Sequence, residues 1–216
     1  MIPVVSIVGK SKAGKTALIE RLVVELKGRG YSVATIKHNP HGFDIDQPGK
    51  DSWRHARSGS DAVVISSPQR LAIIRPMDHD ATIDEIQSLL GGDFDIVLTE
   101  GFRAGKAPKI EVHRKELKEG LLSSPKELLA LVSDEPLPVD VPQFSAEDVA
   151  MIADLIEERL ISRRAAQDAM LFVNGSPIAL NPFTKQFIGN TLLGMISALR
   201  GVGRIRSLEV FVRKKG

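Results

Sequence analysis

Residues 9–16 read Gly-Lys-Ser-Lys-Ala-Gly-Lys-Thr, a complete G-x-x-x-x-G-K-[ST] pattern. It follows the apolar run Val4-Val5-Ser6-Ile7-Val8 and precedes a helical pattern at residues 17–27. A strand, a glycine-rich loop and a helix start are the context in which the pattern G-x-x-x-x-G-K-[ST] binds phosphate, because backbone N–H groups and the helix N-terminus face the anion. The sequence therefore predicts a nucleoside triphosphate site near the start of the chain.

The residues of this loop have separate expected roles. Lys15 is expected to reach the β- and γ-phosphates, and Thr16 to offer its hydroxyl to Mg²⁺. The predicted nucleotide-binding residues of the loop are Gly9, Lys10, Ser11, Lys12, Ala13, Gly14, Lys15 and Thr16. Lys10 stands where dimeric nucleotidases keep a lysine that crosses to the partner's phosphates, although a lysine facing solvent needs no such role.

The composition limits the class of protein. The chain has 216 residues, 43% of them hydrophobic, and no cysteine. This length suits one medium domain with an appendage, and the lack of cysteine excludes disulfides, thiolate metal sites and cysteine nucleophiles. No apolar run approaches the roughly 20 residues that cross a bilayer, and no leader precedes the first strand, so we expect a cytoplasmic protein with no membrane partner.

Charge is unevenly distributed along the chain. Residues 1–161 carry 20 basic and 25 acidic groups, a balance of −5, whereas residues 162–216 carry 9 and 2, a balance of +7. Such a split is typical of a surface for anionic ligands or nucleic acid, or of a cationic module that packs on an acidic neighbour. The second interpretation is favoured and nucleic acid is not an expected partner, because the basic part lacks interleaved aromatic platforms.

Alternating strands and helices predict a P-loop NTPase of the α/β class, with a mostly parallel sheet flanked by helices. The expected strands lie at residues 31–37, 62–66, 71–74, 95–100, 109–113 and 128–133. Further helices are expected from about Ser52, from the capping box Thr82-Ile-Asp-Glu85, and from Ser145-Ala-Glu-Asp148 to about Leu160.

The expected domain boundaries follow from the linker composition. Residues 1–161 form the nucleotide-binding domain, residues 162–168 a short polar linker, and residues 169–216 a small basic α+β module of order β-β-α-β. The expected elements of this module are a hairpin over residues 171–180 with its turn at Asn174-Gly175, a helix over 182–199 and a strand over 205–213.

A phosphate loop gives Mg²⁺ one protein ligand, so an acidic residue is expected at the carboxyl end of a neighbouring buried strand. Asp95 and Glu100 bracket such a strand, and at about 3.3 Å per residue they lie about 16 Å apart. In a parallel sheet Glu100 shares the carboxyl edge with the loop, whereas Asp95 falls at the far rim. Glu100 is therefore the predicted metal ligand beside Thr16 and, with Lys15, a predicted catalytic residue; the alternative is a carboxylate that only caps the loop before Gly101.

Residues 38–57 form a polar stretch rich in glycine and proline that holds the only tryptophan, and long loops of this kind are often functional. We expect a switch or substrate loop that folds over the nucleotide. Its candidate residues are His38, Asp44, Asp46, Lys50, Asp51 and Arg54. Each has a simpler alternative: Asp51 as a helix N-cap, the other two aspartates as solvated turn residues, and Arg54 as a surface ion-pair partner.

Two further candidates keep their alternatives. His38, His41 and His55 suggest a transition-metal site, but no cysteine supports them and their spacing matches no strong template. Asp134 follows a strand at the carboxyl edge, where it is placed either to accept hydrogen bonds from guanine N1 and N2 or to cap the loop ahead of Pro136.

With these residues in place, the chain resembles the molybdopterin-guanine dinucleotide biosynthesis protein B (MobB) family. The matching segments are Val8-Gly-Lys-Ser-Lys-Ala-Gly-Lys-Thr16, Ala34-Thr-Ile-Lys-His38, Phe43-Asp-Ile-Asp46, Pro48-Gly-Lys-Asp-Ser-Trp-Arg-His55, Asp95-Ile-Val-Leu-Thr-Glu-Gly-Phe102 and Lys109-Ile-Glu111. The phosphate loop is shared by very many nucleotidases, whereas the run from Asp44 to His55 is far more specific. The resemblance covers residues 1 to about 160; the rest has no counterpart in the shortest members, although longer ones carry similar extensions.

The resemblance implies a GTP-binding homodimer with weak Mg²⁺-dependent hydrolysis. Such a protein assists a molybdenum cofactor guanylyltransferase, which attaches GMP to molybdopterin and forms the molybdopterin-guanine dinucleotide. By this resemblance residues 9–16 bind the phosphates and Mg²⁺, Glu100 lies on the metal side, and the loop around Asp44 to Arg54 faces the nucleotide or the pterin. The extension would reinforce a dimer, bind the pterin phosphate or dock the partner enzyme; the basic residues considered for the phosphate are Arg200, Arg204 and Arg206.

Two other classes of function are weighed against this one. A P-loop small-molecule kinase needs a receptor pocket and usually an Arg-rich lid, but Arg54, Arg57 and Arg103 are scattered along the chain. A GTPase that delivers metal predicts a tract rich in histidine or cysteine, which this sequence lacks.

Overall fold

The computed structural model describes residues 2–117, 120–162, 169–173, 176–199, 208, 210 and 212. The chain divides into two compact units, residues 1–37 with 90–216 and residues 38–89. The predicted domain 1–161 includes the second unit and does not separate it. Each unit is described by itself below.

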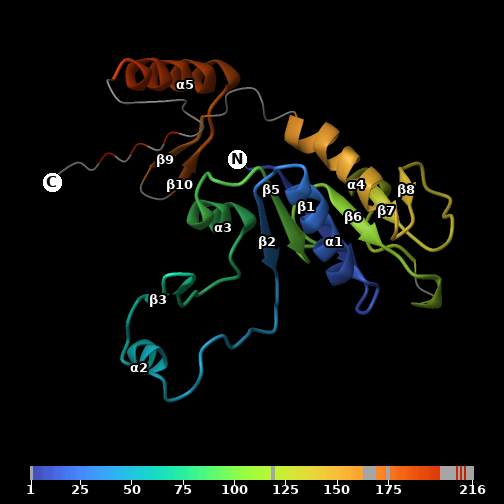
Figure 1. Ribbon diagram of the computed structural model, residues 1–216, viewed down its shortest axis with the longest axis horizontal. Coiled ribbons are helices and arrows are strands. Elements are labelled where there is room, and N and C mark those ends of the chain that lie inside the picture. The colour runs from blue at the N-terminus through green and yellow to red at the C-terminus, as the bar shows by residue number, and fades with distance from the viewer. Residues whose placement is uncertain are drawn as a thin grey trace. The chain divides into compact units, whose positions relative to one another are not determined.

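The first unit contains a six-stranded sheet of order β2-β5-β1-β6-β7-β8, visible in Figure 1. Its strands are β1 (Val4–Gly9), β2 (Val33–Lys37), β5 (Ile96–Glu100), β6 (Lys109–Val112), β7 (Leu128–Val132) and β8 (Gln143–Phe144). Every neighbouring pair in this sheet is parallel, which confirms the predicted α/β class. The edge strand β8 is absent from the sequence prediction.

Two helices of this unit follow the predicted segments. Helix α1 (Lys15–Gly28) begins directly after the phosphate loop, and α4 (Val149–Ile156) continues as a π-helical segment, Glu157–Ile161. The N-cap residue of α4 is Asp148, the last residue of the predicted signal, and its carboxylate accepts the Ser145 N–H at 2.7 Å. None of the helices in the described ranges has the length and apolar character that a bilayer crossing requires.

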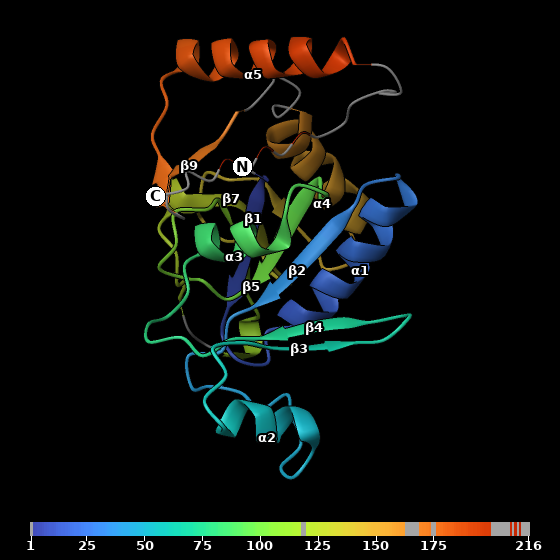
Figure 2. The same cartoon turned by 90° about the vertical axis from the view of Figure 1, so that its left-hand side faces the viewer.

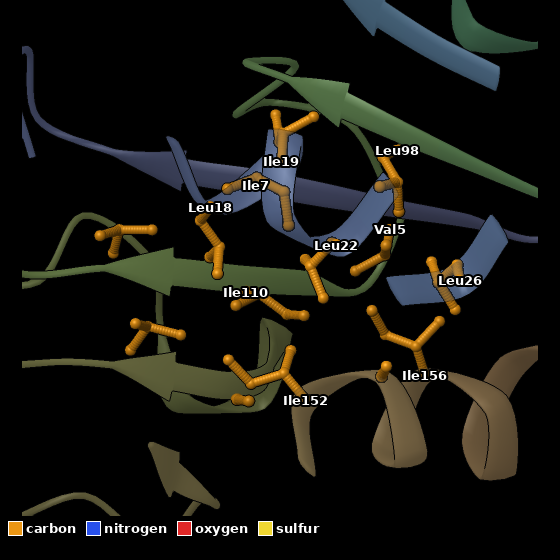
Figure 3. Packing of buried hydrophobic residues seen from close by; sticks show 14 of the residues in the cluster. Val5, Ile7, Leu18, Ile19, Leu22, Leu26, Leu98, Ile110, Ile152 and Ile156 are labelled. Atoms are coloured by element: carbon orange, nitrogen blue, oxygen red, sulfur yellow. The ribbon is translucent and has the colours of Figure 1, made fainter. Parts of the chain in front are cut away.

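The core lies between one face of the sheet and these two helices (Figure 3). Leu18, Leu22 and Leu26 recur at four-residue spacing on α1, so they form one buried stripe. The strands contribute alternate residues, including Val5, Ile7, Leu98 and Ile110, and α4 contributes Ile152 and Ile156. Each fully buried side chain of this size stabilises the fold by roughly 1.5–3 kcal/mol relative to leaving it exposed.

The opposite face of the sheet carries buried polar side chains. The Thr99 hydroxyl donates to the Ser6 hydroxyl at 3.0 Å, and the buried ammonium of Lys109 pairs with Glu127. The buried Glu111 carboxylate accepts the backbone N–H groups of residues 122 and 123 at 2.6 and 2.9 Å. Burying a charge is costly unless it is paired. The contacts of Lys109 and Glu111 therefore fix the segment that joins β6 to β7.

The second unit contains its own small sheet. Strands β3 (Val63–Ser66) and β4 (Leu71–Ile74) pair antiparallel with each other (Figure 2), so they are a hairpin and not part of the parallel sheet. Their connection is too short for a parallel crossover, and the Ser67 N–H donates to the Arg70 carbonyl at 2.8 Å. The unit also holds α2 (Asp51–Arg57), as predicted from about residue 52.

Helix α3 (Ile83–Leu90) begins at the predicted capping box. The Thr82 hydroxyl accepts the Glu85 N–H at 3.2 Å, and the Glu85 carboxylate accepts the Thr82 N–H at 2.8 Å. These bonds from Thr82, with one from His79, lower the pKa of Glu85 to about 2. The capping box is therefore confirmed in both of its hydrogen bonds.

The C-terminal part contains the predicted hairpin and helix. Strands β9 (Leu171–Val173) and β10 (Ser176–Ile178) pair antiparallel, and α5 (Pro182–Ser197) begins after Asn181, whose side chain accepts the Thr184 N–H at 2.8 Å. Several predictions lie outside the described residues: linker residues 163–168, the turn at Asn174-Gly175, Arg200, Arg204, Arg206 and most of the strand at 205–213. The boundaries of the proposed linker and extension stay predictions.

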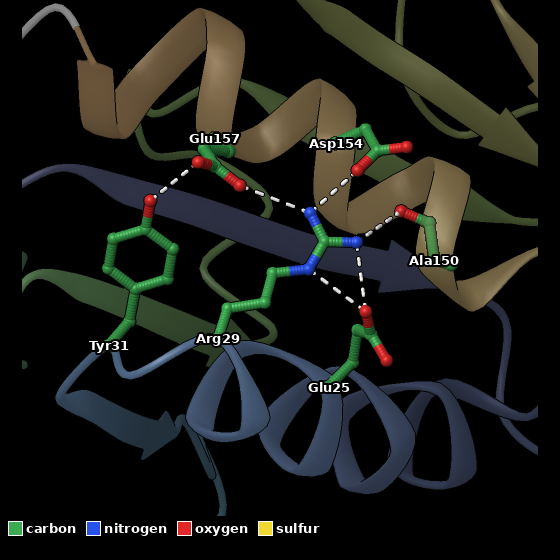
Figure 4. Close-up of polar contacts among 6 residues, drawn as sticks. All are labelled: Glu25, Arg29, Tyr31, Ala150, Asp154 and Glu157. Atoms are coloured by element: carbon green, nitrogen blue, oxygen red, sulfur yellow. Dashed lines mark hydrogen bonds and ion pairs between the residues drawn. The ribbon is translucent and has the colours of Figure 1, made fainter.

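The end of α1 is joined to α4 through the guanidinium of Arg29 (Figure 4). Its acceptors, at 2.6–3.1 Å, are the carboxylates of Glu25, Asp154 and Glu157 and the carbonyl oxygen of Ala150. The Tyr31 hydroxyl donates to the Glu157 carboxylate at 2.7 Å, and this bond, followed by that from Arg29, lowers the pKa of Glu157. The bonds to Asp154 and Glu25 raise the pKa of Arg29 above its ordinary value. One arginine thus fastens two helices whose apolar stripes meet in the core.

Replacing Arg29 by alanine should lower the free energy of unfolding by about 2 kcal/mol, because three carboxylates lose their shared donor. Urea unfolding followed by circular dichroism measures this change. The matched control is Arg159→Ala, which removes a half-exposed arginine whose ion pair with Glu158 is 3.7 Å long, and we expect it to change stability by less than about 0.5 kcal/mol. Equal effects of the two substitutions would contradict a special role for Arg29.

Candidate functional site

The register of the parallel sheet brings five strand ends to one edge. Ile7 of β1 pairs with Glu100 of β5, and Lys37 of β2 pairs with the same Glu100 from the other side. Gly9 pairs with Val112 of β6, which pairs in turn with β7. Residues that directly follow these strands therefore gather at the carboxyl edge, where α/β proteins bind ligands.

The phosphate loop occupies this edge in a conformation that glycine permits. Gly9 and Gly14 have φ values of 142° and 100°, and Lys12 also has a positive φ of 65°. A Cβ atom at Gly9 would stand 2.4 Å from the Val112 carbonyl oxygen, so only glycine fits against β6. The Lys15 ammonium donates to the carbonyl oxygens of Gly9 and Lys10 at 3.0 and 2.6 Å, which holds a positive charge inside the curve of the loop.

Glu100 lies next to the loop, as the strand polarity predicts. The Thr16 hydroxyl donates to one oxygen of its carboxylate at 3.0 Å, and the Lys37 ammonium donates to the other at 3.2 Å. Adjacent ligands of an octahedral Mg²⁺, each about 2.1 Å from the ion, are about 3.0 Å apart. A hydroxyl and a carboxylate at this separation fit such an ion, which takes its remaining ligands from phosphates and water.

Asp95 lies at the opposite end of β5. Its carboxylate accepts the backbone N–H of Ser32 at 2.8 Å, just before β2 begins. This contact ties together the amino ends of two neighbouring strands. The predicted placement of Glu100 at the loop and Asp95 at the far rim is therefore confirmed, while the metal-binding role of Glu100 stays a prediction.

Asp134 is connected to the phosphate loop through Arg114. The Arg114 Nε atom donates to the Ala13 carbonyl oxygen at 3.2 Å, and its guanidinium lies 3.7 Å from the Asp134 carboxylate. The same carboxylate accepts the Lys115 N–H at 2.9 Å, and this bond lowers the pKa of Asp134. Asp134 therefore does cap a loop, as one of the two alternatives predicts. The capped loop is the one that follows β6, and not the predicted one ahead of Pro136.

The six candidates of the predicted switch loop belong to the second unit. The His38 ring lies 2.8 Å from the Asp80 carboxylate, and the Asp46 carboxylate accepts the N–H of Gln47 and the hydroxyl of Ser52 at 2.8 and 3.0 Å.

Lys50 is the N-cap residue of α2, so the alternative role predicted for Asp51, as the N-cap, is wrong by one residue. Asp51 and Arg54 form an exposed ion pair at 3.7 Å, and Asp44 is exposed. Of the simpler alternatives, the surface ion pair of Arg54 and the exposure of Asp44 are present, and a role of the six residues toward the nucleotide stays a prediction.

Within the described ranges, no three His, Asp or Glu side chains gather closely enough to hold a metal ion. The pairing of a hydroxyl with a single carboxylate at Thr16 and Glu100 is a different kind of site, since Mg²⁺ usually takes few protein ligands.

Lys37 and Arg114 lie at the site but were not among the predicted site residues. Lys37 is the last residue of a predicted strand, so the same polarity argument that selected Glu100 places it at the loop edge. Arg114 follows the next predicted strand in the same way. Both residues could have been predicted to lie at this edge from their position at a strand end. The contact of Lys37 with Glu100 and that of Arg114 with Ala13 depend on the order of the strands in the sheet, which the sequence did not specify.

The fold and the loop sequence together define the class of this protein: an α/β protein of the P-loop type. A family model described as molybdopterin guanine dinucleotide synthesis protein B (MobB) matches residues 4–134. The chain belongs to the MobB family.

Relatives and a solved structure agree with this family. Two proteins described as molybdopterin-guanine dinucleotide biosynthesis adapter protein are similar to the chain. The one from Haemophilus influenzae is 36% identical over 160 residues, 74% of this chain and 90% of the relative. The one from Escherichia coli is 33% identical over 168 residues, 73% of this chain and 93% of the relative. The crystal structure of Bacillus subtilis MobB gives a TM-score of 0.60 at 27% identity, covering 74% of this chain and 98% of that one.

Gly9→Ala should destabilise the protein by at least about 1–3 kcal/mol, because the new methyl group meets the Val112 carbonyl and the backbone has a positive φ. Thermal unfolding measures this change. Gly28→Ala is the matched control: nothing lies within 4 Å of its Cβ position and it ends a helix, so we expect a neutral or slightly stabilising effect. A Gly9 variant as stable as the Gly28 variant would contradict the close approach of the loop to β6.

Proposed function

We propose that this protein binds GTP and Mg²⁺ at residues 9–16 and acts as an accessory protein in molybdenum cofactor biosynthesis. In this role it assists a guanylyltransferase in attaching GMP to molybdopterin. The observation that carries the proposal is the contact of Thr16 with Glu100, at 3.0 Å, beside a phosphate loop whose lysine is already directed into the loop. The names of the adapter proteins from Haemophilus influenzae and Escherichia coli supply the pathway.

Each residue has a defined part in nucleotide binding. The backbone N–H groups of the loop and the N-terminus of α1 bind the phosphate oxygens. Lys15 turns from two carbonyl oxygens to the β- and γ-phosphates, and Thr16 and Glu100 bind Mg²⁺. Lys37 lies on the far oxygen of Glu100, where its charge reduces the repulsion between that carboxylate and the phosphates.

Hydrolysis by this site is expected to be weak. Fast phosphoryl transfer needs a group that positions the attacking water and a cation, commonly an arginine, that stabilises charge on the γ-phosphate. Two arginines that follow strands at this edge are held by backbone carbonyl oxygens: Arg114 by Ala13, with Asp134 3.7 Å away, and Arg103 by Leu122. The chemistry of the site therefore suits nucleotide binding with slow turnover, in line with an accessory role.

The proposed assembly is a homodimer that docks on the guanylyltransferase. Lys10 would reach the partner's phosphates from its place after the first glycine of the loop. The pathway ligand is molybdopterin or its guanine dinucleotide, and the place of action is the cytoplasm. Co-purification of the full chain with the guanylyltransferase is the direct test of the partner; failure of the two proteins to associate with or without GTP would contradict the docking proposal.

Lys15→Ala should abolish GTP binding, because the loop loses the side chain that neutralises the β- and γ-phosphates. Isothermal titration with GTP and with ATP, each in the presence of Mg²⁺, measures the affinity. The wild-type protein is expected to prefer GTP, and Lys126→Ala, an exposed lysine distant in sequence from the loop, serves as the control. Unchanged GTP affinity in the Lys15 variant would refute the site, and equal or better ATP binding by the wild type would favour a kinase.

Glu100→Gln should weaken Mg²⁺-dependent GTP binding and hydrolysis about tenfold or more, whereas Asp95→Asn should leave both nearly unchanged. The reason is geometric: Glu100 contacts Thr16 at the loop, and Asp95 contacts Ser32 at the opposite edge. Titrating Mg²⁺ at fixed GTP while following hydrolysis compares the two variants directly. A larger loss in the Asp95 variant would overturn the metal assignment.

A further inference from the structure

A pocket of about 270 Å³ lies where β6 and β7 end, within the first unit. Its polar lining comes from His113, Lys115 and Glu135, which directly follow these two strands. Its apolar lining includes Leu121, Leu137 and Pro138. This size is just below the roughly 300–1,000 Å³ of sites for drug-sized ligands, so it suits a single bicyclic ring.

Both walls of this pocket are held by buried or bonded side chains. On one side, the Glu111 carboxylate accepts the N–H groups of Leu122 and Ser123, which fixes the backbone next to Leu121. On the other side, the Gln143 amide of β8 accepts the Leu137 N–H at 3.0 Å and donates to the Leu137 carbonyl at 2.7 Å. A pocket whose walls are fixed in this way loses little entropy when a rigid ring enters it.

Glu135 presents its carboxylate in this pocket with only loose contacts. One oxygen lies 3.4 Å from the His113 ring nitrogen, and the other lies 3.6 Å from the Lys115 ammonium. The Glu135 side chain is 29% exposed, which leaves it reachable from solvent. Each oxygen therefore keeps acceptor capacity for a ligand, and two oxygens side by side match two adjacent N–H donors.

We propose that this pocket recognises the 2-amino-4-oxopyrimidine edge shared by guanine and pterin, and that Glu135 is the residue that reads it. This edge presents a ring N–H next to an exocyclic NH₂ group, so a carboxylate accepts both hydrogen bonds. Adenine presents a ring acceptor at the corresponding place and is rejected. The apolar lining faces the flat ring, as in most ligand sites. The proposal rests on the proposed function, since both rings belong to the dinucleotide that the family is named for.

Glu135 fits this task better than its neighbour Asp134. The Asp134 carboxylate is engaged by the Lys115 N–H and lies near Arg114, and it does not line the pocket. In this arrangement Asp134 positions the loop, and Glu135 selects the ring.

The test compares Glu135→Gln with the wild type in binding three ligands. GTP and XTP are titrated with Mg²⁺ by calorimetry, and 6-hydroxymethylpterin is titrated by its own fluorescence. Replacing the carboxylate by an amide removes a charged acceptor, so the affinity for the recognised ring should fall about tenfold or more. Glu116→Gln is the matched control, because it removes an exposed carboxylate of the segment after β6 that does not line the pocket.

The outcomes separate the two sources of the ring. If guanine occupies the pocket, GTP affinity falls in the Glu135 variant and XTP binding improves relative to GTP, since the new amide can donate to the xanthine 2-oxo group. If pterin occupies it, affinity for 6-hydroxymethylpterin falls while GTP binding is unchanged. The XTP shift is a readout that simple destabilisation of the loop would not produce, and unchanged GTP binding alongside the pterin loss shows that the variant is still folded.

The proposal is overturned if neither ligand loses affinity in the Glu135 variant, or if the Glu116 variant loses as much. It is also overturned if Asp134→Asn, and not Glu135→Gln, removes the preference for GTP. In these cases GTP binding that still depends on Lys15 would leave the proposed function standing. Conversely, pterin binding that depends on Glu135 in a protein that binds no GTP would support the pocket and refute the nucleotide proposal.

Discussion

The parallel pairing of β1 with β5 on one side and β6 on the other is the constraint on which the site depends. Its register places Ile7 beside Glu100 and Gly9 beside Val112. Side chains alternate between the faces of a strand, so a slip of one residue would turn the Glu100 carboxylate to the opposite face, away from Thr16. A 3.0 Å contact at the edge of the sheet is therefore set by strand pairing deep within it.

The two faces of the sheet contribute differently to this arrangement. The face under α1 and α4 is apolar, and its packing fixes where the helix behind the phosphate loop lies. On the other face, Glu111 and Lys109 are buried and each is paired with the segment between β6 and β7. Apolar packing is not directional, whereas these hydrogen bonds and ion pairs are. The buried Glu111 and Lys109 side chains therefore hold the segment between β6 and β7 in one position, which apolar contacts alone would not do.

Local signals in the sequence predicted the phosphate loop, the placement of Glu100 and the capping box at Thr82, because each depends on residues close together or on the polarity of one strand. The antiparallel pairing of β3 with β4 was missed, since strand patterns do not reveal which sheet a strand joins. Strand β8 was missed because two residues show no periodicity. The contacts of Lys37 and Arg114 required the order of the strands, which is a property of the whole sheet.

The charges at the carboxyl edge are arranged so that an anion can enter without leaving a charge unpaired. The Lys15 ammonium is held by two carbonyl oxygens, so it can turn to a phosphate without breaking an ion pair. The Glu100 carboxylate contacts Thr16 at the loop, and Lys37 already balances its charge. In the proposed function, Mg²⁺ would take the Glu100 oxygen that contacts Thr16, while Lys37 stays on the other oxygen. Binding of the cation and of the anion would then be coupled through one glutamate.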